Sequence, residues 1–159
     1  MRIIFRDGFF VGATFAIAAG IYFAWLWRAE HQVRLHTAHF FRNIDMKNWE
    51  AVAADVSPDY RDDWSNDRAL LTARLRELLS ARGQIEIVAH DSNLHIEQRD
   101  AFFRAKITIQ GQGEIVSIIK ERVNPLSAPF ELLWRRQSIK PWDWKLVRVS
   151  NAELQLPAD

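Results

Sequence analysis

Residues 101–110, AFFRAKITIQ, decide the fold class because their side chains alternate along the chain. Ala101, Phe103, Ala105, Ile107 and Ile109 fall on one face of an extended segment, and the residues between them are mostly polar. Successive side chains of a β-strand point to opposite faces of its sheet, so this spacing predicts a strand with one buried face. Burial on one face is typical of an antiparallel sheet.

Segments on either side of this strand complete the predicted sheet. They alternate in the same way or are rich in β-branched residues, and glycines at 111 and 113 mark a turn. We predict strands at 84–97, 101–110, 114–123, 130–137 and 144–150, with a loop at 124–129 and a hairpin connection at 139–143.

Helical spacing of apolar residues precedes the sheet. The pattern predicts a helix over 28–44, a short helix after Asp45 as its N-cap, and a third helix after the caps at 65–67. The second helix stops at Ser57-Pro58, because the residue before a proline is driven out of the α region. The third carries a stripe of leucines and ends at a glycine: Leu71, Leu75, Leu78, Leu79 and Gly83. Helices followed by antiparallel strands predict an α+β domain with the helices on one sheet face.

An apolar segment of another kind begins the chain. Residues 8–27, GFFVGATFAIAAGIYFAWLW, contain no charged side chain. A helix of this length rises about 30 Å, the thickness of the hydrocarbon core of a bilayer. We therefore predict a transmembrane helix at 8–27, continued without a break by the helix at 28–44. A cleaved signal peptide is the alternative, but cleavage after Ala18 would leave an exposed apolar stub.

The predicted anchor suggests an orientation and a partner. The short N-terminus at 1–7 favours a cytoplasmic start, which places the domain outside the inner membrane and leaves 152–159 as a C-terminal tail. Small residues at every fourth position let two membrane helices approach closely. They form a candidate homodimer face: Gly8, Gly12, Ala16, Gly20 and Ala24.

Composition narrows the possible functions. After residue 27 the chain keeps 19 basic and 19 acidic residues, a balance that argues against nucleic-acid binding. Cysteine is absent, which excludes disulfides and thiolate metal sites.

Three motifs give the domain a family resemblance. Residues 40–62, FFRNIDMKNWEAVAADVSPDYRD, resemble the opening of the nuclear transport factor 2-like superfamily, which includes ketosteroid isomerases and SnoaL-like cyclases. Residues 100–109 and 144–147 resemble two of its strands. The resemblance covers roughly residues 33–151. It implies a curved antiparallel sheet wrapped by helices into a cone with a hydrophobic pocket.

Two groups of polar residues could carry chemistry, and each has a structural alternative. Asp59, Asp62, Asp63 and Asp67 could form a base or metal site, but turns and N-caps use aspartates in the same way. His36 and His39 have the spacing of a metal pair without a third ligand, which favours a solvated face. Isomerases of the family hold an acid on the sheet, where this chain has basic residues: Arg104, Lys106, Arg135, Arg136 and Arg148. We assign no catalytic residue, metal or cofactor.

Aromatic residues are the candidates for the pocket wall. Tyr60, Trp64, Phe103 and Trp134 could line it, with core packing as the alternative. Of Trp142 and Trp144, alternation leaves one exposed for a partner or a membrane surface.

The sequence thus favours a non-catalytic binding or assembly domain held at a membrane, with a possible protein partner. The alternative is an enzyme or carrier that uses the cone pocket for a small apolar ligand, as an isomerase, cyclase or dehydratase would. A buried ionisable group in an open pocket would favour the alternative, and a pocket filled by aromatic side chains would oppose it.

Overall fold

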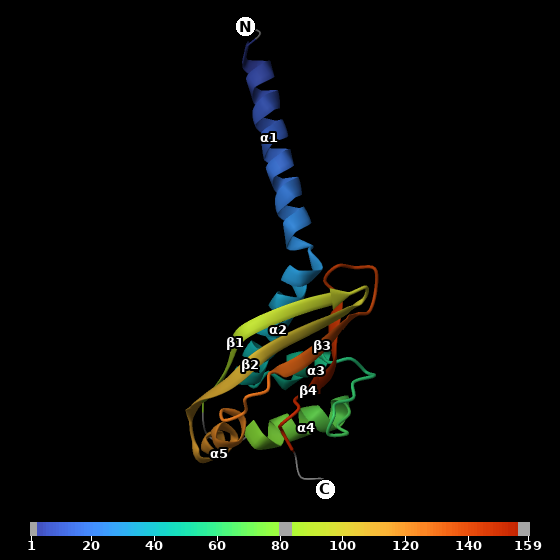
Figure 1. Cartoon of the computed structure of the whole chain (residues 1–159). Helices are drawn as coiled ribbons and strands as arrows, with labels where there is room; N and C mark the ends of the chain where they lie inside the picture. Colours follow the sequence, from blue (N-terminus) through green and yellow to red (C-terminus); the bar gives the residue numbers. More distant parts are fainter. Residues whose placement is uncertain (1–2, 80–83, 156–159) are drawn as a thin grey trace.

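The computed structural model describes residues 3–79 and 84–155, without the side chains of residues 3–11, 23, 25 and 26. A long helix, α1 (Ile3–Leu26), projects from a domain of helices and one sheet (Figure 1). In chain order the domain consists of α2 (Ala29–Asp45), α3 (Trp49–Asp55), α4 (Arg68–Leu79), β1 (Gln84–Glu97), β2 (Asp100–Gln112), α5 (Glu114–Val123), β3 (Phe130–Arg136) and β4 (Trp144–Ser150).

The four strands form an antiparallel sheet in the order β1-β2-β3-β4. The alternation predicted for β2 is confirmed, since Ala101, Phe103, Ala105, Ile107 and Ile109 are all buried. The pairing register shifts between His90 and Asn93, and again between Leu133 and Trp134. Such irregularities bend a strand and increase its twist, which lets the long β1–β2 pair curve around the helices.

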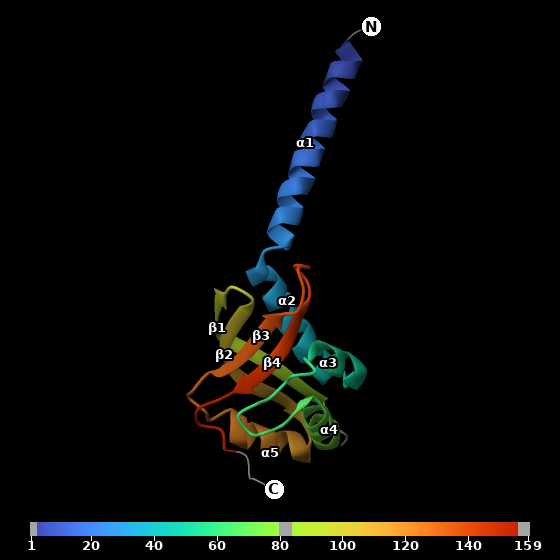
Figure 2. The same cartoon turned by 90° about the vertical axis from the view of Figure 1, so that its right-hand side faces the viewer.

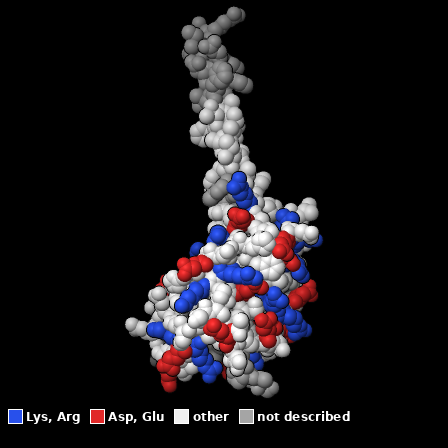
Figure 3. Space-filling view, in the orientation of Figure 1, with Lys and Arg blue, Asp and Glu red and all other residues white. Residues whose placement is uncertain are grey.

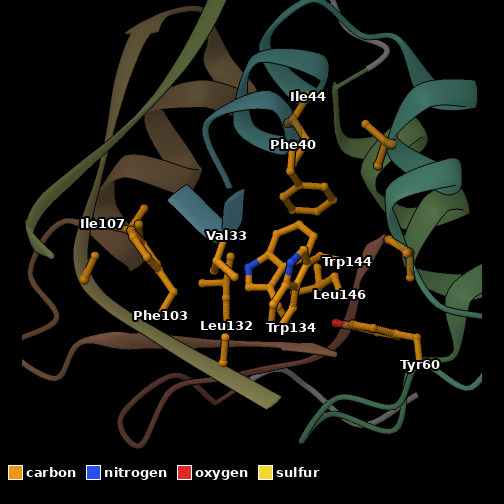
Figure 4. Packing of buried hydrophobic residues seen from close by; sticks show 14 of the residues in the cluster. Val33, Phe40, Ile44, Tyr60, Phe103, Ile107, Leu132, Trp134, Trp144 and Leu146 are labelled. Carbon is orange, nitrogen blue, oxygen red and sulfur yellow. The ribbon is translucent and has the colours of Figure 1, made fainter. Parts of the chain in front are cut away.

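The core lies between α2 and the concave face of this sheet (Figure 4). Val33, Phe40 and Ile44 of α2 are buried there, as the helical spacing predicts. The Phe40 ring meets Trp134 of β3 edge to face, with ring centroids 6.1 Å apart. Helices therefore cover one face of an antiparallel sheet, and the predicted α+β class is confirmed.

Two sequence predictions about local structure were wrong, one about a strand and one about a helix cap. Residues 114–123 are helix α5, not a strand. Asp45 is the last residue of α2, and the cap of α3 is Asn48, whose side chain accepts a hydrogen bond from the Ala51 backbone N–H. Asp67 does cap α4, through a hydrogen bond from the Leu70 N–H. The predicted C-cap Gly83 lies outside the described residues.

The N-terminal helix is also not continuous with the domain. α1 ends at Leu26, and Arg28 has an extended backbone, with φ −60° and ψ 133°, before α2 begins. The expectation of one unbroken helix from 8 to 44 was therefore wrong. Within the part of the chain that the structure describes, no helix is long and apolar enough to cross a membrane.

Candidate functional site

An apolar cavity of about 270 Å³ lies between α2, α4 and the sheet. All three layers supply its wall, which is almost entirely hydrocarbon. The principal apolar residues are Phe40, Phe41 and Ile44 of α2, Leu71, Leu75 and Leu78 of α4, and Ile87, Ile107, Ile109 and Leu132 of the sheet. We call this space the inner cavity.

The cavity exists because α4 does not close against the sheet. Leu79 is the one residue of its described helix that is buried, and Leu78 is 49% exposed. The leucine stripe that the sequence predicts as a packing face therefore borders a hollow space. An unfilled apolar space forfeits dispersion contacts, so a ligand with matching shape would gain them.

A second cavity of about 320 Å³ adjoins the inner cavity and extends to α5. The two share wall residues that include Ile44, Leu75 and Ile109. Leu78 and Ile118, both about half exposed, border the second cavity. Helices α4 and α5, which carry these two exposed residues, lie at the end of the domain opposite α1 (Figure 2), so the second cavity borders the surface at that end.

Asp62 organises a hydrogen-bonded cluster of residues beside the inner cavity. Oδ1 of Asp62 accepts hydrogen bonds from the backbone N–H groups of Trp64 at 3.0 Å and Asn66 at 2.8 Å. Oδ2 accepts from Asn66 Nδ2 at 2.8 Å and from the Tyr60 hydroxyl at 3.2 Å. Both oxygens are thus engaged in holding the loop between α3 and α4, which is the turn function that the sequence favours for this aspartate.

Tyr60 stays a neutral hydrogen-bond donor in this cluster. Burial raises the pKa of its hydroxyl far above the usual value, and the nearby Asp62 carboxylate raises it further. The aromatic ring is 1% exposed and lines the cavity. A phenol held in this way can orient a neighbour, but it does not give up its proton near neutral pH.

The two helical histidines lie elsewhere and do not act as a pair. His36 donates from Nε2 to the Trp142 carbonyl at 2.8 Å, and burial lowers its pKa. His39 contacts Asp55, with Nδ1 and Oδ2 3.0 Å apart. Within residues 3–79 and 84–155, no cluster of three or more His, Cys, Asp or Glu side chains is arranged to hold a metal ion.

The four aromatic candidates for the pocket separate into three environments. Tyr60 and Trp64 line the inner cavity. Phe103 borders a different groove between α2 and β1, beside Arg34 and Arg42. Trp134 is fully buried in the core, between His36 and Phe40. Sequence reasoning missed Asn66, which it treated only as a cap, and the cavity role of the α4 leucines.

The basic residues of the strands lie away from this cavity. Arg104 and Arg148 both bond Glu131, at 2.6 and 3.3 Å, and Arg135 forms a two-pronged pair with Asp100. This hydrogen bonding by Arg135 lowers the pKa of the Asp100 carboxyl. These groups hold neighbouring strands together, and none of the five is among the residues that line the inner cavity.

Helix α1 presents apolar side chains without packing on the domain. Phe15, Ile17 and Ile21 are each more than 60% exposed. The part of α1 whose side chains the structure describes carries no Lys, Arg, Asp or Glu (Figure 3). Gly12, Ala16, Gly20 and Ala24 are exposed, and no atom lies within 4 Å of a Cβ built on Gly12 or Gly20. The side-chain environment of Gly8 lies outside the described residues. Trp144 is buried, whereas Trp142 is 52% exposed.

Comparison with known proteins supports the fold. No protein-family model matches the chain, and no curated protein matches it by sequence. A nuclear transport factor 2-like protein with a cystatin-like fold from Novosphingobium aromaticivorans superposes with a TM-score of 0.56, over 85% of this chain and 86% of its own, at 18% identity. A proposed dehydratase of the same family from Streptomyces avermitilis gives 0.56 over 75% and 91%, at 16% identity.

A third structure, from Catenulispora acidiphila in complex with S-DNPA, gives a TM-score of 0.57 over 77% of this chain and 90% of its own, at 14% identity. At such identities the likeness shows the fold alone. The chain therefore has the nuclear transport factor 2-like, cystatin-like fold that the motifs at 40–62, 100–109 and 144–147 predict.

Proposed function

We propose that the domain is a binding protein for a small apolar ligand, which it holds in the inner cavity. The observation that carries this proposal is a hollow, hydrocarbon-lined space between α4 and the sheet, open at one end of the domain. Ligand sites of small molecules are concave and mostly apolar, with a few placed polar groups. Asp62 and Asn66 are the polar residues of the loop between α3 and α4 that border it.

Binding is favoured over catalysis by the state of Asp62. It is the buried carboxylate on the described cavity wall, and four hydrogen bonds already occupy its oxygens. A general base needs a free lone pair within reach of the proton it removes. The dehydratase description and the S-DNPA complex of two structural neighbours support a pocket that can hold small molecules, and either chemistry or binding fits them.

Filling the cavity tests this proposal. Leu75→Trp adds a large ring to a position that lines both cavities. The matched control is Leu70→Trp on the same helix, because Leu70 is exposed and lines neither cavity. The probe is 1-aminoanthracene, whose fluorescence rises in apolar surroundings. It is titrated into the full chain in lipid nanodiscs, with empty nanodiscs as the background.

We expect the wild-type chain and Leu70→Trp to bind the probe alike, and Leu75→Trp to lose at least tenfold in affinity, since an overfilled cavity cannot also hold a ligand. Equal binding by the two variants, or none by the wild type, contradicts the proposal. Conversion of a bound carbonyl compound by the wild-type chain would favour an enzyme instead.

We further propose that α1 tethers this domain to a membrane. Support comes from the uncharged run at 8–27 and from the exposure of its described large apolar residues. Exposed apolar surface on a helix that projects into solvent is unfavourable, and a bilayer would remove it from water. The connection between β3 and β4 lies at the same end of the domain as α1 (Figures 1 and 2), and its Ile139 and Trp142 side chains are exposed.

The cavities would then face away from the bilayer, on the extracytoplasmic side if the short N-terminus stays in the cytoplasm. A bacterial fusion of alkaline phosphatase to the C-terminus tests this orientation. Activity supports it, because the enzyme folds only outside the cytoplasm, and an inactive but full-length fusion contradicts it.

A further inference from the structure

The two outer edges of the sheet differ, because one is covered and the other is open. The outer edge of β4 is covered by residues 56–61, in which Val56 forms a parallel bridge with Leu146 and the Arg61 backbone N–H donates to the Val147 carbonyl at 3.1 Å. Strand β1 forms the other edge. Among the residues that the structure describes, no strand pairs with its outer side.

The backbone of residues 87 and 89 points to this open edge. In an antiparallel ladder, alternate residues direct both their N–H and C=O groups away from the neighbouring strand. Ile87 is such a residue, because its N–H donates to Asp45 of α2. Its partner Ile109 on β2 likewise turns both groups away from β1, to the Asn124 side chain. Ala89, two residues along, has the orientation of Ile87.

Three backbone groups at this edge are free to bond another chain. The N–H and C=O of Ala89 and the C=O of Ile87 have no hydrogen-bond partner in the described part of the chain. Unpaired groups in a row along a strand are a template for an added strand. One residue of such a strand could exchange two hydrogen bonds with Ala89.

A groove of about 400 Å³ runs along this edge, between β1 and α2. Residues 86–89 of β1 all line it, although successive side chains of a strand point to opposite faces of the sheet. The groove therefore lies beside the edge and not over one face. On the other side, α2 contributes the exposed Ala38, whose small side chain leaves room for an extended peptide.

One end of the groove carries a charge without a counter-ion. Arg34 of α2 is exposed and donates to the neutral Ser92 hydroxyl at 3.0 Å. It forms no ion pair with a described residue. Asp45 and Glu86 line the other end, and Asp45 is eleven residues away on α2, about 16 Å. An acidic side chain beside Arg34 would complement its charge.

We propose that the outer edge of β1 binds an extended peptide segment of a partner protein, which adds a strand to the sheet and places an acidic side chain against Arg34. Hydrogen bonds to the strand backbone give such a peptide affinity, and its side chains in the groove give specificity. This inference goes beyond the proposed function and does not depend on it. The groove shares only Phe41 and Ile87 with the wall of the inner cavity.

Two variants disturb the two parts of this site separately. Ala89→Pro removes the edge N–H and leaves the ladder to β2 intact, because proline is tolerated on an edge strand where the N–H faces outward. Arg34→Glu reverses the charge at the end of the groove. The matched control is Arg76→Glu, since Arg76 is an exposed arginine of α4 that lines neither the groove nor the inner cavity. Circular dichroism of each variant checks the fold.

The probe is a phage-displayed library of random octapeptides. It is selected against the full chain in lipid nanodiscs after depletion on empty nanodiscs, and the most enriched peptide is synthesised and titrated by fluorescence anisotropy. We expect selected peptides to carry Asp or Glu. Binding should weaken at least tenfold in Arg34→Glu and in Ala89→Pro, about the size of one hydrogen bond or more, and stay unchanged in Arg76→Glu.

Two changes in the peptide separate recognition from stability. Replacing its acid by lysine should restore binding to Arg34→Glu, which a merely structural role of Arg34 would not produce. Methylating its backbone N–H groups one at a time should abolish binding at alternate positions only, because alternate residues of an added strand face β1. This second measurement needs no change in the protein.

The inference is overturned if no peptide is enriched over empty nanodiscs, or if the selected peptides lack an acid. A peptide that binds folded Arg34→Glu or folded Ala89→Pro as tightly as the wild type overturns it too, as does methylation without alternation. Each of these results leaves the inner cavity proposal standing, because that proposal is tested by 1-aminoanthracene and Leu75→Trp.

Discussion

Asp45 ends α2 with its carboxylate beneath β1, where it accepts a hydrogen bond from the Ile87 backbone N–H at 3.2 Å. Burial raises its pKa from 3.8 to about 6, and the nearby Glu86 adds to the rise, while the Ile87 bond opposes it. The folded chain therefore holds this proton more tightly than the unfolded chain does. The stabilisation is complete below pH 3.8 and is lost as the pH rises through about 6.

Replacing this acid by its amide tests the linkage. Asp45→Asn keeps an acceptor for Ile87 but removes the partly buried charge. At pH 7.5 we expect the free energy of unfolding of the variant to exceed that of the wild type by about 1 kcal/mol, after allowance for partial exposure. Near pH 4 the two free energies should match. Urea unfolding of the full chain across this range is the measurement. A variant less stable than the wild type at pH 7.5 would contradict the assignment.

Trp134 and Trp64 make a second test at the residue scale. Trp134 is fully buried, so Trp134→Ala should lower the free energy of unfolding by about 3–5 kcal/mol. Trp64 borders the inner cavity, where its Nε1 donates to the Leu154 carbonyl at 2.9 Å. Trp64→Ala should cost less, about 1–2 kcal/mol, because Trp64 is only partly buried and has fewer packing contacts to lose. Urea unfolding of both variants decides, and an equal loss would refute the distinction between core and wall.

Trp134 and Trp64 also show which properties of single residues the sequence predicts. Alternation and helix spacing predict which aromatic side chains point inward, and the burial of Trp134 agrees. They carry no information on whether the inward space is filled. That depends on how closely α4 approaches the sheet, a distance set by packing between segments far apart in the chain. Asn66 was overlooked for the same reason, because its capping chemistry hides its place on the wall.

Helix α5 is a secondary-structure element whose type the sequence pattern does not predict. Residues 115–119 are rich in isoleucine and valine, whose branched side chains favour strands. Yet β3 pairs with residues 100–105 of β2, and beyond them the Asn124 side chain, which follows α5, bonds the backbone N–H and carbonyl of Ile109. Val116 is buried and Val123 lines both cavities. The tertiary context thus overrides local propensity, which a single sequence does not reveal.

The small residues of α1 permit a prediction for that element. We propose a homodimer in which two α1 helices pack through the exposed face that contains Gly12, Ala16 and Gly20. Gly12→Ile should reduce cross-linked dimers in membranes at least fivefold. Nothing lies within 4 Å of a Cβ at this position, so the isoleucine disturbs no contact within its own chain. Ala18→Ile, on the opposite side of the helix, is the control. Unchanged cross-linking in Gly12→Ile would contradict the proposal that this face forms the dimer.

At the scale of the whole molecule, the two ends of the domain differ. The end that carries α1 also carries the β3–β4 connection, which is held against α2 by the bond from His36 to the Trp142 carbonyl. Ile139 is 97% exposed there, and Trp142 is half exposed. The opposite end carries α4, α5 and the openings of the cavities. If α1 tethers the domain to a membrane, the end with the β3–β4 connection would lie near the lipid, and the end with α4, α5 and the cavities would lie in water.

The difference between the two ends predicts that the β3–β4 connection contacts lipid, which can be measured without disturbing the fold. The chain has no cysteine, so a nitroxide spin label can be placed at single sites through Ile139→Cys or Ser117→Cys. Ser117 is exposed on α5, at the far end. In lipid vesicles we expect the label at 139 to be shielded from a water-soluble nickel reagent and accessible to oxygen, since aromatic and apolar side chains settle at the bilayer interface. The label at 117 should be fully accessible to nickel. Equal nickel access at both sites would mean that the domain stands clear of the bilayer, because the fixed hairpin cannot reach lipid without bringing residue 139 there.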